Sequence, residues 1–531
     1  TSHIYILPFG YLIELFTLSN YTTQVNPVKL AFAKCLTGQR FAIIQQMATP
    51  SKNILWLSVS RVFSLGLLFL AYTQLFRYLG PEQSGQFQFV LSYVTLFGVV
   101  IDFGIQQYII KKISEDRSKA KQYFHSFLAV EVVLAILVYG AMVGVAFWNG
   151  YEPIVLKAIM VAGLGVALHG LIYPFLAVIT AFYDLKKAAL LNFISSVINV
   201  GIIFLTIWLN GSIVMLVTQQ VVYALLALVM YYHYVQAHIG KPEILKGIAT
   251  LRPGLIKQIL KASLPFALLV GFSTIYNRID IIIISQMLGY TQTGLYTAAY
   301  KFFDLLGFFP AVVSHALYPV FATLMATNQI SAVRETLERY LRFMAAVALP
   351  MATGGMLLSE PIIRVLAGEQ FIEAANVLAV LIWAPAILFL YVVVNALVIS
   401  QLTRYATYIT GFNVLVNIVG NILLLPRYGI VAAAATTIFS ETLQGGYYFY
   451  LVKKKITQFT FFRNIWQPFV AAGLMGIAVF FLRDQFLLIP MVVGAAVYGI
   501  LLLSFGFFRK EDWQYLTKLL RRGYEPDKTE N

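Results

Sequence analysis

Long apolar runs, each about the length needed to cross a bilayer, dominate the sequence from residue 54 to residue 507. A membrane-spanning helix needs about 20 mostly apolar residues, and short polar segments separate the runs that meet this requirement. The pattern therefore predicts an all-α polytopic membrane protein with about 14 transmembrane helices. These cover 54–76, 86–109, 124–147, 154–180, 188–209, 212–234, 264–287, 294–323, 338–359, 374–400, 406–425, 430–452, 464–482 and 486–507.

The composition removes other classes of protein. Hydrophobic residues make up 60% of the 531 residues and charged residues 11%, whereas charged residues reach roughly 25% in soluble domains. So few charges cannot cover a soluble fold of this size, which excludes a cytosolic enzyme, a nucleic-acid-binding module and a disordered scaffold. The single cysteine, Cys35, excludes a disulfide framework and a cysteine-based metal or iron–sulfur site.

The positions of the basic residues predict the orientation of the spans. With a cytoplasmic N-terminus and strict alternation, cytoplasmic segments carry 27 lysines and arginines and outer loops carry five. Such an excess follows the positive-inside rule. We therefore expect a multi-pass protein of the inner (cytoplasmic) cell membrane with both termini in the cytoplasm. Its net charge of +15 should face anionic membrane lipids, and no nucleic acid is expected as a partner.

Three segments lie outside the predicted spans. Residues 1–46 differ from the rest of the chain, and we hypothesise that Met47 is the initiator and that these residues are upstream translated sequence. The alternative is a genuine N-terminal extension. Within the linker 235–263 and the tail 508–531, residues 243–261 and 511–522 place apolar residues at helical spacing among basic ones, which predicts cytoplasmic amphipathic helices at the membrane surface. The alternative is a solvated loop and a solvated tail.

A short motif occurs twice, each time in the first outer loop of a block of six spans. The pattern Leu-Gly, four residues, Gly, one residue, aromatic begins at Leu79 and again at Leu288. Glycines suit a tight turn and a close approach to the next helix. The repeat predicts two six-helix lobes of the same orientation, 54–234 and 264–452, with the substrate path between them. Two accessory helices in 464–507 lie outside it.

Charged residues inside the predicted spans are few, because each costs about 2.5–3.5 kcal/mol at the centre of a bilayer. The basic ones are Arg61, Arg278 and Lys301, and they predict a cavity that binds phosphate groups. The alternative is that they pair with acids and lock helices together, as the three-residue spacing of Lys301 and Asp304 allows. Arg278 and Asp280 are two residues apart and cannot point the same way.

Acidic residues in the spans are candidates for taking up a coupling ion, H+ or Na+. They are Asp280, Glu441 and Asp102, and Glu131 also lies within a span. No histidine or carboxylate pattern has the spacing of a metal site, so no metal site is predicted.

Three asparagines, Asn413, Asn417 and Asn421, follow one another at four-residue intervals and form a stripe on one helix face. Amide side chains commonly hold membrane helices together by hydrogen bonds. The alternative is that Asn417 and Asn421 contact a sugar-sized substrate.

Sequence motifs for catalysis are absent. The chain contains no Walker-type loop and no Gly-x-Ser-x-Gly motif. The outer loops are short, the longest being about 360–373, whereas membrane glycosyltransferases and polymerases usually need an extended outer loop with catalytic acids. The sequence thus predicts a transporter that needs no cofactor, and not an enzyme.

Three stretches, in order along the chain, resemble the O-antigen and polysaccharide flippases of bacteria and archaea. This family is a branch of the multidrug/oligosaccharidyl-lipid/polysaccharide flippase superfamily, and the resemblance covers about 54–507. The stretches are Arg77-Tyr78-Leu79-Gly80-Pro81 running on to Asp102-Phe103-Gly104, then Asp280 with Leu288-Gly289 and Ala298-Ala299-Tyr300-Lys301, and then Asn417 and Asn421 with Leu425-Pro426-Arg427-Tyr428-Gly429.

The resemblance implies alternating access by two six-helix lobes around a central cationic cavity. The implied substrate is a polyprenyl-diphosphate-linked oligosaccharide, moved from the inner to the outer leaflet for O-antigen or exopolysaccharide synthesis. Arg61, Arg278 and Lys301 fit the diphosphate site, although topology alone and no motif matches Arg61. Implied partners are a polysaccharide polymerase and glycosyltransferases. The alternatives are a cation-coupled drug or metabolite antiporter of the same superfamily and a membrane glycosyltransferase or polymerase.

Overall fold

In the computed structural model, the described residues are 50–182, 185–240 and 253–507, and all regular structure within them is helical. The first half of the described chain, residues 50–239, is called here the N-terminal half. Its helices are α3 (Pro50–Asp102), α4 (Ile105–Glu115), the 3-10 turn η4 (Arg117–Lys119), α5 (Ala120–Trp148), α6 (Pro153–Gly170), α7 (Ile172–Ala181), α8 (Leu185–Trp208) and α9 (Ile213–Ile239).

The C-terminal half, residues 253–455, is followed by two further helices. Its elements are α11 (Pro253–Leu306), α12 (Phe308–Ala326), α13 (Ile330–Leu357), α14 (Ser359–Ala367), the 3-10 turn η5 (Glu369–Phe371), α15 (Ala374–Leu381), α16 (Trp383–Tyr428) and α17 (Ile430–Lys455). The further helices are α18 (Phe462–Leu482) and α19 (Leu488–Ser504).

Kinks divide the three longest helices, and each helix covers all of one predicted span and part of another. Gly80 interrupts α3 at φ 69° and ψ 178°, and Gly289 interrupts α11 at φ 85° and ψ 176°. Only glycine adopts these angles without strain. The two positions are equivalent in the sequence motif, and the predicted glycine turns are confirmed. Leu402 kinks α16 between the predicted spans 374–400 and 406–425.

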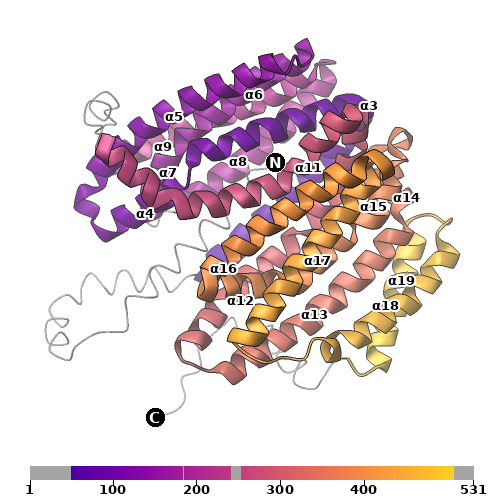
Figure 1. The fold of residues 1–531 in the computed structure, drawn as a ribbon. Coiled ribbons are helices and arrows are strands. Elements are labelled where there is room, and N and C mark those ends of the chain that lie inside the picture. The colour runs from indigo at the N-terminus through magenta and orange to yellow at the C-terminus, as the bar shows by residue number, and fades with distance from the viewer. Residues whose placement is uncertain (1–49, 183–184, 241–252, 508–531) are drawn as a thin grey trace.

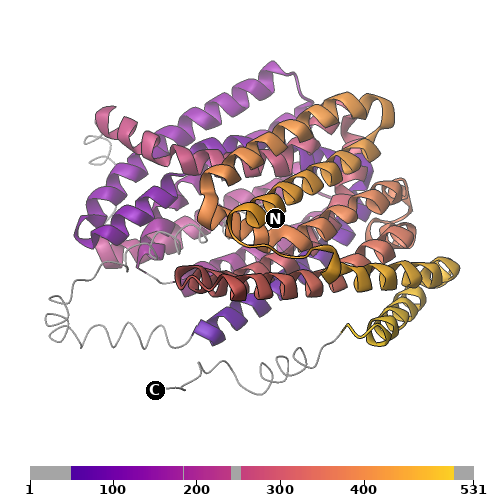
Figure 2. The same cartoon turned by 60° about the horizontal axis from the view of Figure 1, so that its bottom comes forward.

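The two halves lie side by side and meet along α3 and α11. In Figure 1 the helices α4 to α9 gather on one side and α12 to α17 on the other, with α3 and α11 between them. Figures 1 and 2 show α18 and α19 beside α13, outside both halves. We call the line of contact between α3 and α11 the seam, and the end of the bundle with Gly80 and Gly289 the glycine end.

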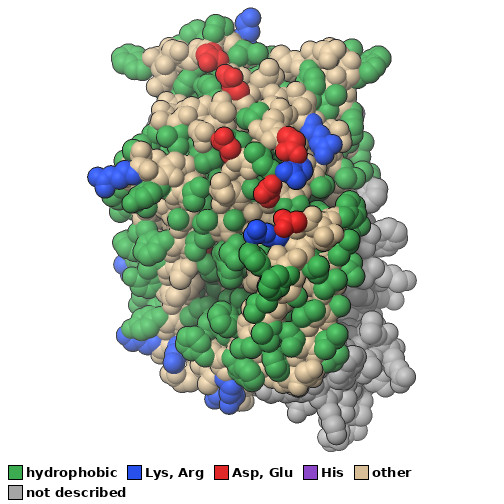
Figure 3. Space-filling view, turned by 90° about the vertical axis from the view of Figure 1, so that its right-hand side faces the viewer, with side chains coloured by type: hydrophobic (Ala, Val, Ile, Leu, Met, Phe, Trp, Pro, Cys, Tyr) green, Lys and Arg blue, Asp and Glu red, His purple; other side chains and the backbone are tan. Residues whose placement is uncertain are grey.

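The surface of the bundle is that of a membrane protein. Within the described residues, 8 helices are long and apolar enough to cross a membrane. Trp148, Trp208 and Phe481, at the ends of α5, α8 and α18, are 92%, 78% and 79% exposed. Aromatic side chains at helix ends are typical of the membrane–water interface. Figure 3 shows one face covered mainly by apolar side chains; the acidic ones visible there lie in its upper half, and basic ones alone show at its lower edge.

Helix breaks that the sequence did not predict interrupt three of the predicted spans, because apolar runs continue through the breaks. The span 86–109 breaks at Phe103 and Gly104, 154–180 breaks at Leu171, and 294–323 breaks at Gly307. The end of the linker 235–263 is not a separate surface helix, since α11 already begins at Pro253. The remaining linker residues 241–252 lie outside the described chain, as do the N-terminal segment 1–46 and the tail 508–531.

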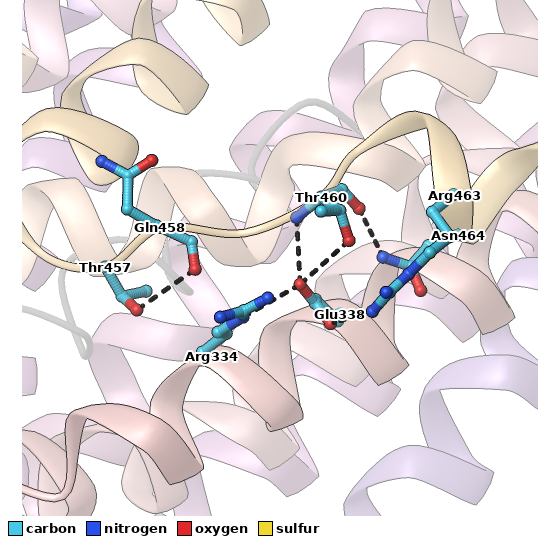
Figure 4. Close-up of polar contacts among 7 residues, drawn as sticks. All are labelled: Arg334, Glu338, Thr457, Gln458, Thr460, Arg463 and Asn464. Atoms are coloured by element: carbon cyan, nitrogen blue, oxygen red, sulfur yellow. Dashed lines mark hydrogen bonds and ion pairs between the residues drawn. The ribbon is translucent and has the colours of Figure 1, made fainter.

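The half-buried carboxylate of Glu338 attaches α18 and α19 to the C-terminal half. Oε1 of Glu338 in α13 accepts hydrogen bonds from the backbone N–H and hydroxyl of Thr460, at 2.9 and 3.1 Å, and from Nε of Arg334 at 3.2 Å (Figure 4). Nη2 of Arg463 lies 3.7 Å from Oε2 of Glu338. Thr460 in turn accepts a hydrogen bond from Asn464 in the first turn of α18. One side chain thus fixes the loop that leads into α18.

We expect Glu338→Gln to destabilise the docking of α18 and α19. The neutral amide presents only one acceptor oxygen and loses the charge-assisted bonds, which are worth about 1.5–3 kcal/mol each. Thermal unfolding in detergent should show a lower midpoint or a separate early transition. The matched control is Glu335→Gln, because Glu335 is 70% exposed and pairs with Arg339 on the same helix. Equal midpoints for the two variants would contradict the assignment.

Candidate functional site

The two copies of the repeated motif contact each other at the seam. A Cβ on Gly85 of α3 would lie 1.8 Å from the carbonyl oxygen of Tyr290, and one on Gly294 of α11 would lie 1.8 Å from that of Pro81. Real Cβ atoms essentially never come within 3.0 Å of another heavy atom. Only glycine therefore permits this reciprocal backbone contact. The motif predicted that the glycines allow a close approach to a neighbouring helix. In the structure this approach is between α3 and α11, and it therefore joins the two halves.

Polar contacts between the halves surround the glycine contact. Nη2 of Arg77 donates to the carbonyl oxygen of Val365 at 2.8 Å, and Nε2 of Gln370 donates to that of Arg77 at 3.0 Å. Further along, Nε2 of Gln286 donates to the hydroxyl of Tyr151 at 3.4 Å. The glycine end is closed in this conformation, and these bonds must break if the halves separate there.

Two of the three predicted cations lie on the faces of α11 that meet the N-terminal half. Arg278 is two helical turns beyond Gly271, whose Cβ position is 3.5 Å from Val99 of α3, so the two residues share one face. Nζ of Lys301 lies 4.4 Å from the ring centroid of Tyr72 in α3. The structure thus brings Arg278 and Lys301 to the seam. Arg61 lies on α3, but its side chain is outside the described residues.

The two cations differ in how they are neutralised. Lys301 lies 3.7 Å from Oδ2 of Asp304, the pair that their spacing predicted. Arg278 is 8% exposed and forms no ion pair or hydrogen bond within the described part of the chain. The side chain of Tyr300 lies close enough to interact electrostatically with it. It does not pair with Asp280, as the two-residue spacing indicated. A guanidinium held this way among apolar helices is well suited to an anionic ligand.

Asp280 is buried in the C-terminal half, where four helical segments converge. Its carboxylate accepts hydrogen bonds from Nδ2 of Asn421 at 2.8 Å, the hydroxyl of Tyr296 at 3.0 Å and the hydroxyl of Thr437 at 3.2 Å. Nδ2 of Asn421 also donates to Oδ1 of Asn417 at 3.2 Å. The carboxylate lies on α11 before the Gly289 kink, and its donors lie on α11 after the kink, on α16 and on α17. A carboxylate with three donors is well stabilised in its charged form.

Glu441 forms a second node one helical turn away along both α11 and α17. Its oxygens accept from the hydroxyl of Tyr276 at 2.8 Å and from that of Tyr391 at 2.5 Å. Tyr276 precedes Asp280, and Thr437 precedes Glu441, by four residues, so the nodes stack along the same helix faces. The tyrosines and the threonine are not conspicuous in the sequence by themselves. The four-residue spacing was a usable signal for Tyr276 and Thr437.

The asparagine stripe faces the protein interior in this conformation. Asn413, Asn417 and Asn421 are at most 1% exposed, and Asn413 donates to Oε1 of Gln444 at 2.6 Å. The structure therefore favours the helix-contact interpretation over direct contact with a sugar. Oδ1 of Asn421 is buried and has no hydrogen-bond partner among the described residues, although it lies beside the Asp280 node.

Asp102, the remaining predicted ion site, lies apart from these nodes. It is the last residue of α3, in the N-terminal half, and is 4% exposed. No group of three histidine, cysteine, aspartate or glutamate side chains among the described residues is arranged to hold a metal ion.

Comparison with known proteins identifies the family. The pattern of the family described as "Polysaccharide biosynthesis protein" matches residues 51–325, and that of MatE matches 265–423. "Probable flippase AglR" of Haloferax volcanii is 25% identical over 257 residues, which cover 46% of this chain and 54% of that protein. The chain thus spans about half of AglR. "Probable low-salt glycan biosynthesis flippase Agl15" of the same organism is 21% identical and covers 73% and 80% respectively.

Solved structures share the fold. "Lipid II flippase MurJ, inward closed conformation" aligns with a TM-score of 0.68 and 16% identity, over 88% of this chain and 100% of that one. The helical arrangement is therefore that of a known class of multi-span membrane proteins, and more than half of the chain matches one family pattern. The chain belongs to the polysaccharide biosynthesis protein family of multi-pass membrane proteins.

Proposed function

We propose that this protein is a flippase that moves a polyprenyl-diphosphate-linked oligosaccharide from the inner to the outer leaflet for cell-surface polysaccharide synthesis. Membership of a polysaccharide biosynthesis family, whose relatives include probable flippases, supports this. The family consists of transport proteins, so the proposal includes no catalytic step. The seam between the halves, with the buried Arg278 and the half-buried Lys301, is the observation on which the proposal rests.

The proposed architecture has fourteen crossings in two six-helix lobes, 54–234 and 264–452, and two accessory helices in 464–507. Each of the kinked helices α3, α11 and α16 supplies two crossings. Both termini are cytoplasmic, which follows from the 27-to-5 distribution of basic residues. The glycine end then faces outward, and the closed contact there makes this an inward-directed state of an alternating-access cycle.

Arg278 and Lys301 hold the diphosphate of the substrate in this proposal. Arginine binds phosphate oxygens bidentately, whereas lysine acts as a point charge. Asp304 already neutralises part of the charge on Lys301, so Arg278 contributes more. Arg61 remains in the proposal as a third cation. A drug antiporter is the alternative, and it is less well supported because two cations, Arg278 and Lys301, lie at the seam against one acid, Asp304.

The node at Asp280 is the proposed site of a coupling cation. It combines one carboxylate with the spare buried oxygen of Asn421 and the hydroxyl of Thr437. Oxygen ligands of this kind suit a hard cation such as Na+. Glu441 and Asp102 are further candidates; both oxygens of Glu441 are already bonded to tyrosines.

The proposed function is tested by flipping of defined lipid-linked oligosaccharides in proteoliposomes. Arg278→Ala should weaken substrate binding by about 2 kcal/mol, or roughly 30-fold, and Lys301→Ala by less. The control is Arg427→Ala, since Arg427 is exposed at the end of α16. Wild-type rates in both seam variants would overturn the cation assignment, and no flipping by the wild-type protein would overturn the function.

A further inference from the structure

Two buried carboxyl groups in the N-terminal half have no part in the seam. Asp102 ends α3 and Glu131 lies within α5, and they are 4% and 0% exposed. Both oxygens of Glu131 and Oδ1 of Asp102 have no hydrogen-bond partner in the described part of the chain. The two carboxyl groups lie close enough to act on each other electrostatically. This buried, unpartnered pair needs a physical explanation.

No basic side chain of the described residues pairs with either carboxyl group. The titratable group that faces both is Tyr173 of α7. The ring of His169 in α6 packs 5.3 Å from that of Tyr173 and 5.8 Å from that of Tyr223 in α9. Two carboxylates without a cation would be very costly here, because low-dielectric surroundings penalise uncompensated charge. At least one of the pair therefore carries a proton.

Comparison of Glu131 with Asp280 and Glu441 of the C-terminal half indicates which cation Glu131 binds. Asp280 receives three donors and Glu441 receives two, and these hydrogen bonds favour the charged form of each carboxyl group. No amide or hydroxyl of the described chain bonds to Glu131, and a metal cation needs such neighbouring groups as ligands. A proton binds directly to a carboxylate oxygen and needs no such ligands. The environment of Glu131 thus fits a proton better than Na+.

Local geometry also indicates which carboxyl carries the proton. The backbone N–H of Gln106 donates to Asp102, at the N-terminus of α4, where the helix dipole favours a negative charge. Glu131 has no such donor. The charge therefore rests on Asp102 and the proton on Glu131.

The pair lies between two helix breaks. Phe103 and Gly104 separate α3 from α4 with φ of 40° and 66°, angles that favour glycine and strain Phe103. Leu171 separates α6 from α7, and a Cβ on the adjacent Gly170 would lie 2.3 Å from Ile101 and 3.9 Å from Oε2 of Glu131. Broken helices beside buried polar groups are typical of ion sites in transporters.

We propose that Glu131 is a proton-binding site of the N-terminal half, with Asp102 as its charged partner. When the helix breaks move and admit water, the O–H bond of Glu131 breaks, the proton passes to water and the carboxylate remains. The site couples the shape of this half to the proton gradient, separately from the cation node at Asp280.

Infrared spectroscopy of the full chain in lipid tests the proposal directly, because a protonated carboxyl and a carboxylate absorb differently. The wild-type protein should show a protonated carboxyl band near neutral pH that shifts in D2O. Glu131→Gln should remove the band of one carboxyl group. In Asp102→Asn the neighbouring negative charge is gone, so Glu131 should release its proton at a lower pH than in the wild type. This variant should retain the band at neutral pH but lose it at an alkaline pH at which the wild type keeps it.

The control is Glu82→Gln, an exposed carboxylate at the glycine end, which should leave the band unchanged. Retention of the full band in Glu131→Gln would overturn the proposal. Loss of the wild-type band on addition of Na+ would also overturn it and would identify a metal-cation site instead. If Glu131→Gln fails to fold, the altered pH response of Asp102→Asn still decides the question. The measurement requires no transport, so its failure is distinct from failure of the flippase function.

Discussion

Gly85→Ala should prevent the glycine end from closing and should abolish flipping. The new methyl carbon would lie 1.8 Å from the carbonyl oxygen of Tyr290, which is backbone and cannot rotate away. To make room for the methyl group, α3 and α11 would have to move apart, which opposes closure. Overpacking of this kind costs about 1–3 kcal/mol. States of a transporter differ by a few kcal/mol, so the shift changes their ratio by about tenfold to a hundredfold.

Spin labels on the exposed residues Gln83 and Thr291 measure this effect, because they flank the contact on opposite sides of the seam. The distance between them should lengthen in Gly85→Ala, and again in the double variant with Gly294→Ala. Gly144→Ala is the matched control, since nothing lies within 4 Å of its Cβ position. Unchanged distances together with unchanged flipping would show that the contact is not a gate.

Asp280→Asn should abolish the response of the protein to its coupling cation. In wild-type protein, Na+ at about 100 times its Kd should stabilise the fold by about 2.7 kcal/mol, since it binds only the folded state. The variant retains the shape of the side chain but lacks the charge. Its amide also directs N–H groups toward the donors Asn421, Tyr296 and Thr437. Flipping driven by a cation gradient should be lost with the stabilisation.

Thermal unfolding in Na+ and in K+ provides the measurement, and the full chain is used throughout. Asp484→Asn serves as control, because Asp484 is 90% exposed between α18 and α19. Glu441→Gln shows which node binds the cation: loss of the Na+ response there, with retention in Asp280→Asn, would move the site to the tyrosine node. A wild-type protein insensitive to Na+ would exclude Na+ as the ion.

Hydrophobic runs predicted the helices well, but not where they break. A bilayer forces the backbone to form its hydrogen bonds within one helix, so apolar length alone identifies a span. The breaks at Phe103, Leu171 and Gly307 do not interrupt the apolar run. They are invisible to a count of apolar residues, although Gly104 and Gly307 mark two of them.

The candidate site could be predicted as a set of unusual residues, but not as an arrangement. The cost of burying charge made Arg278, Asp280, Lys301 and Glu441 conspicuous, and the three-residue spacing predicted the ion pair of Lys301 with Asp304. Three of the donors that hold Asp280 and Glu441, namely Asn421, Thr437 and Tyr276, lie more than a hundred residues from the carboxylate they bind. Such partners depend on the rotation of each helix about its axis, which a single sequence does not specify.

The sequence by itself determined that this chain is a helical membrane protein with a repeated glycine motif and a few charges at membrane depth. Local physics suffices for these features, because hydrophobic length, glycine φ and desolvation act within a few residues. Only the tertiary structure decided that the two motifs contact each other and that Asp280 has three donors. It also decided that, among the residues the structure describes, Arg278 has no anionic partner and Glu131 has no hydrogen-bond donor. These outcomes depend on how whole helices pack, because contacts between distant segments form only after packing has placed them together.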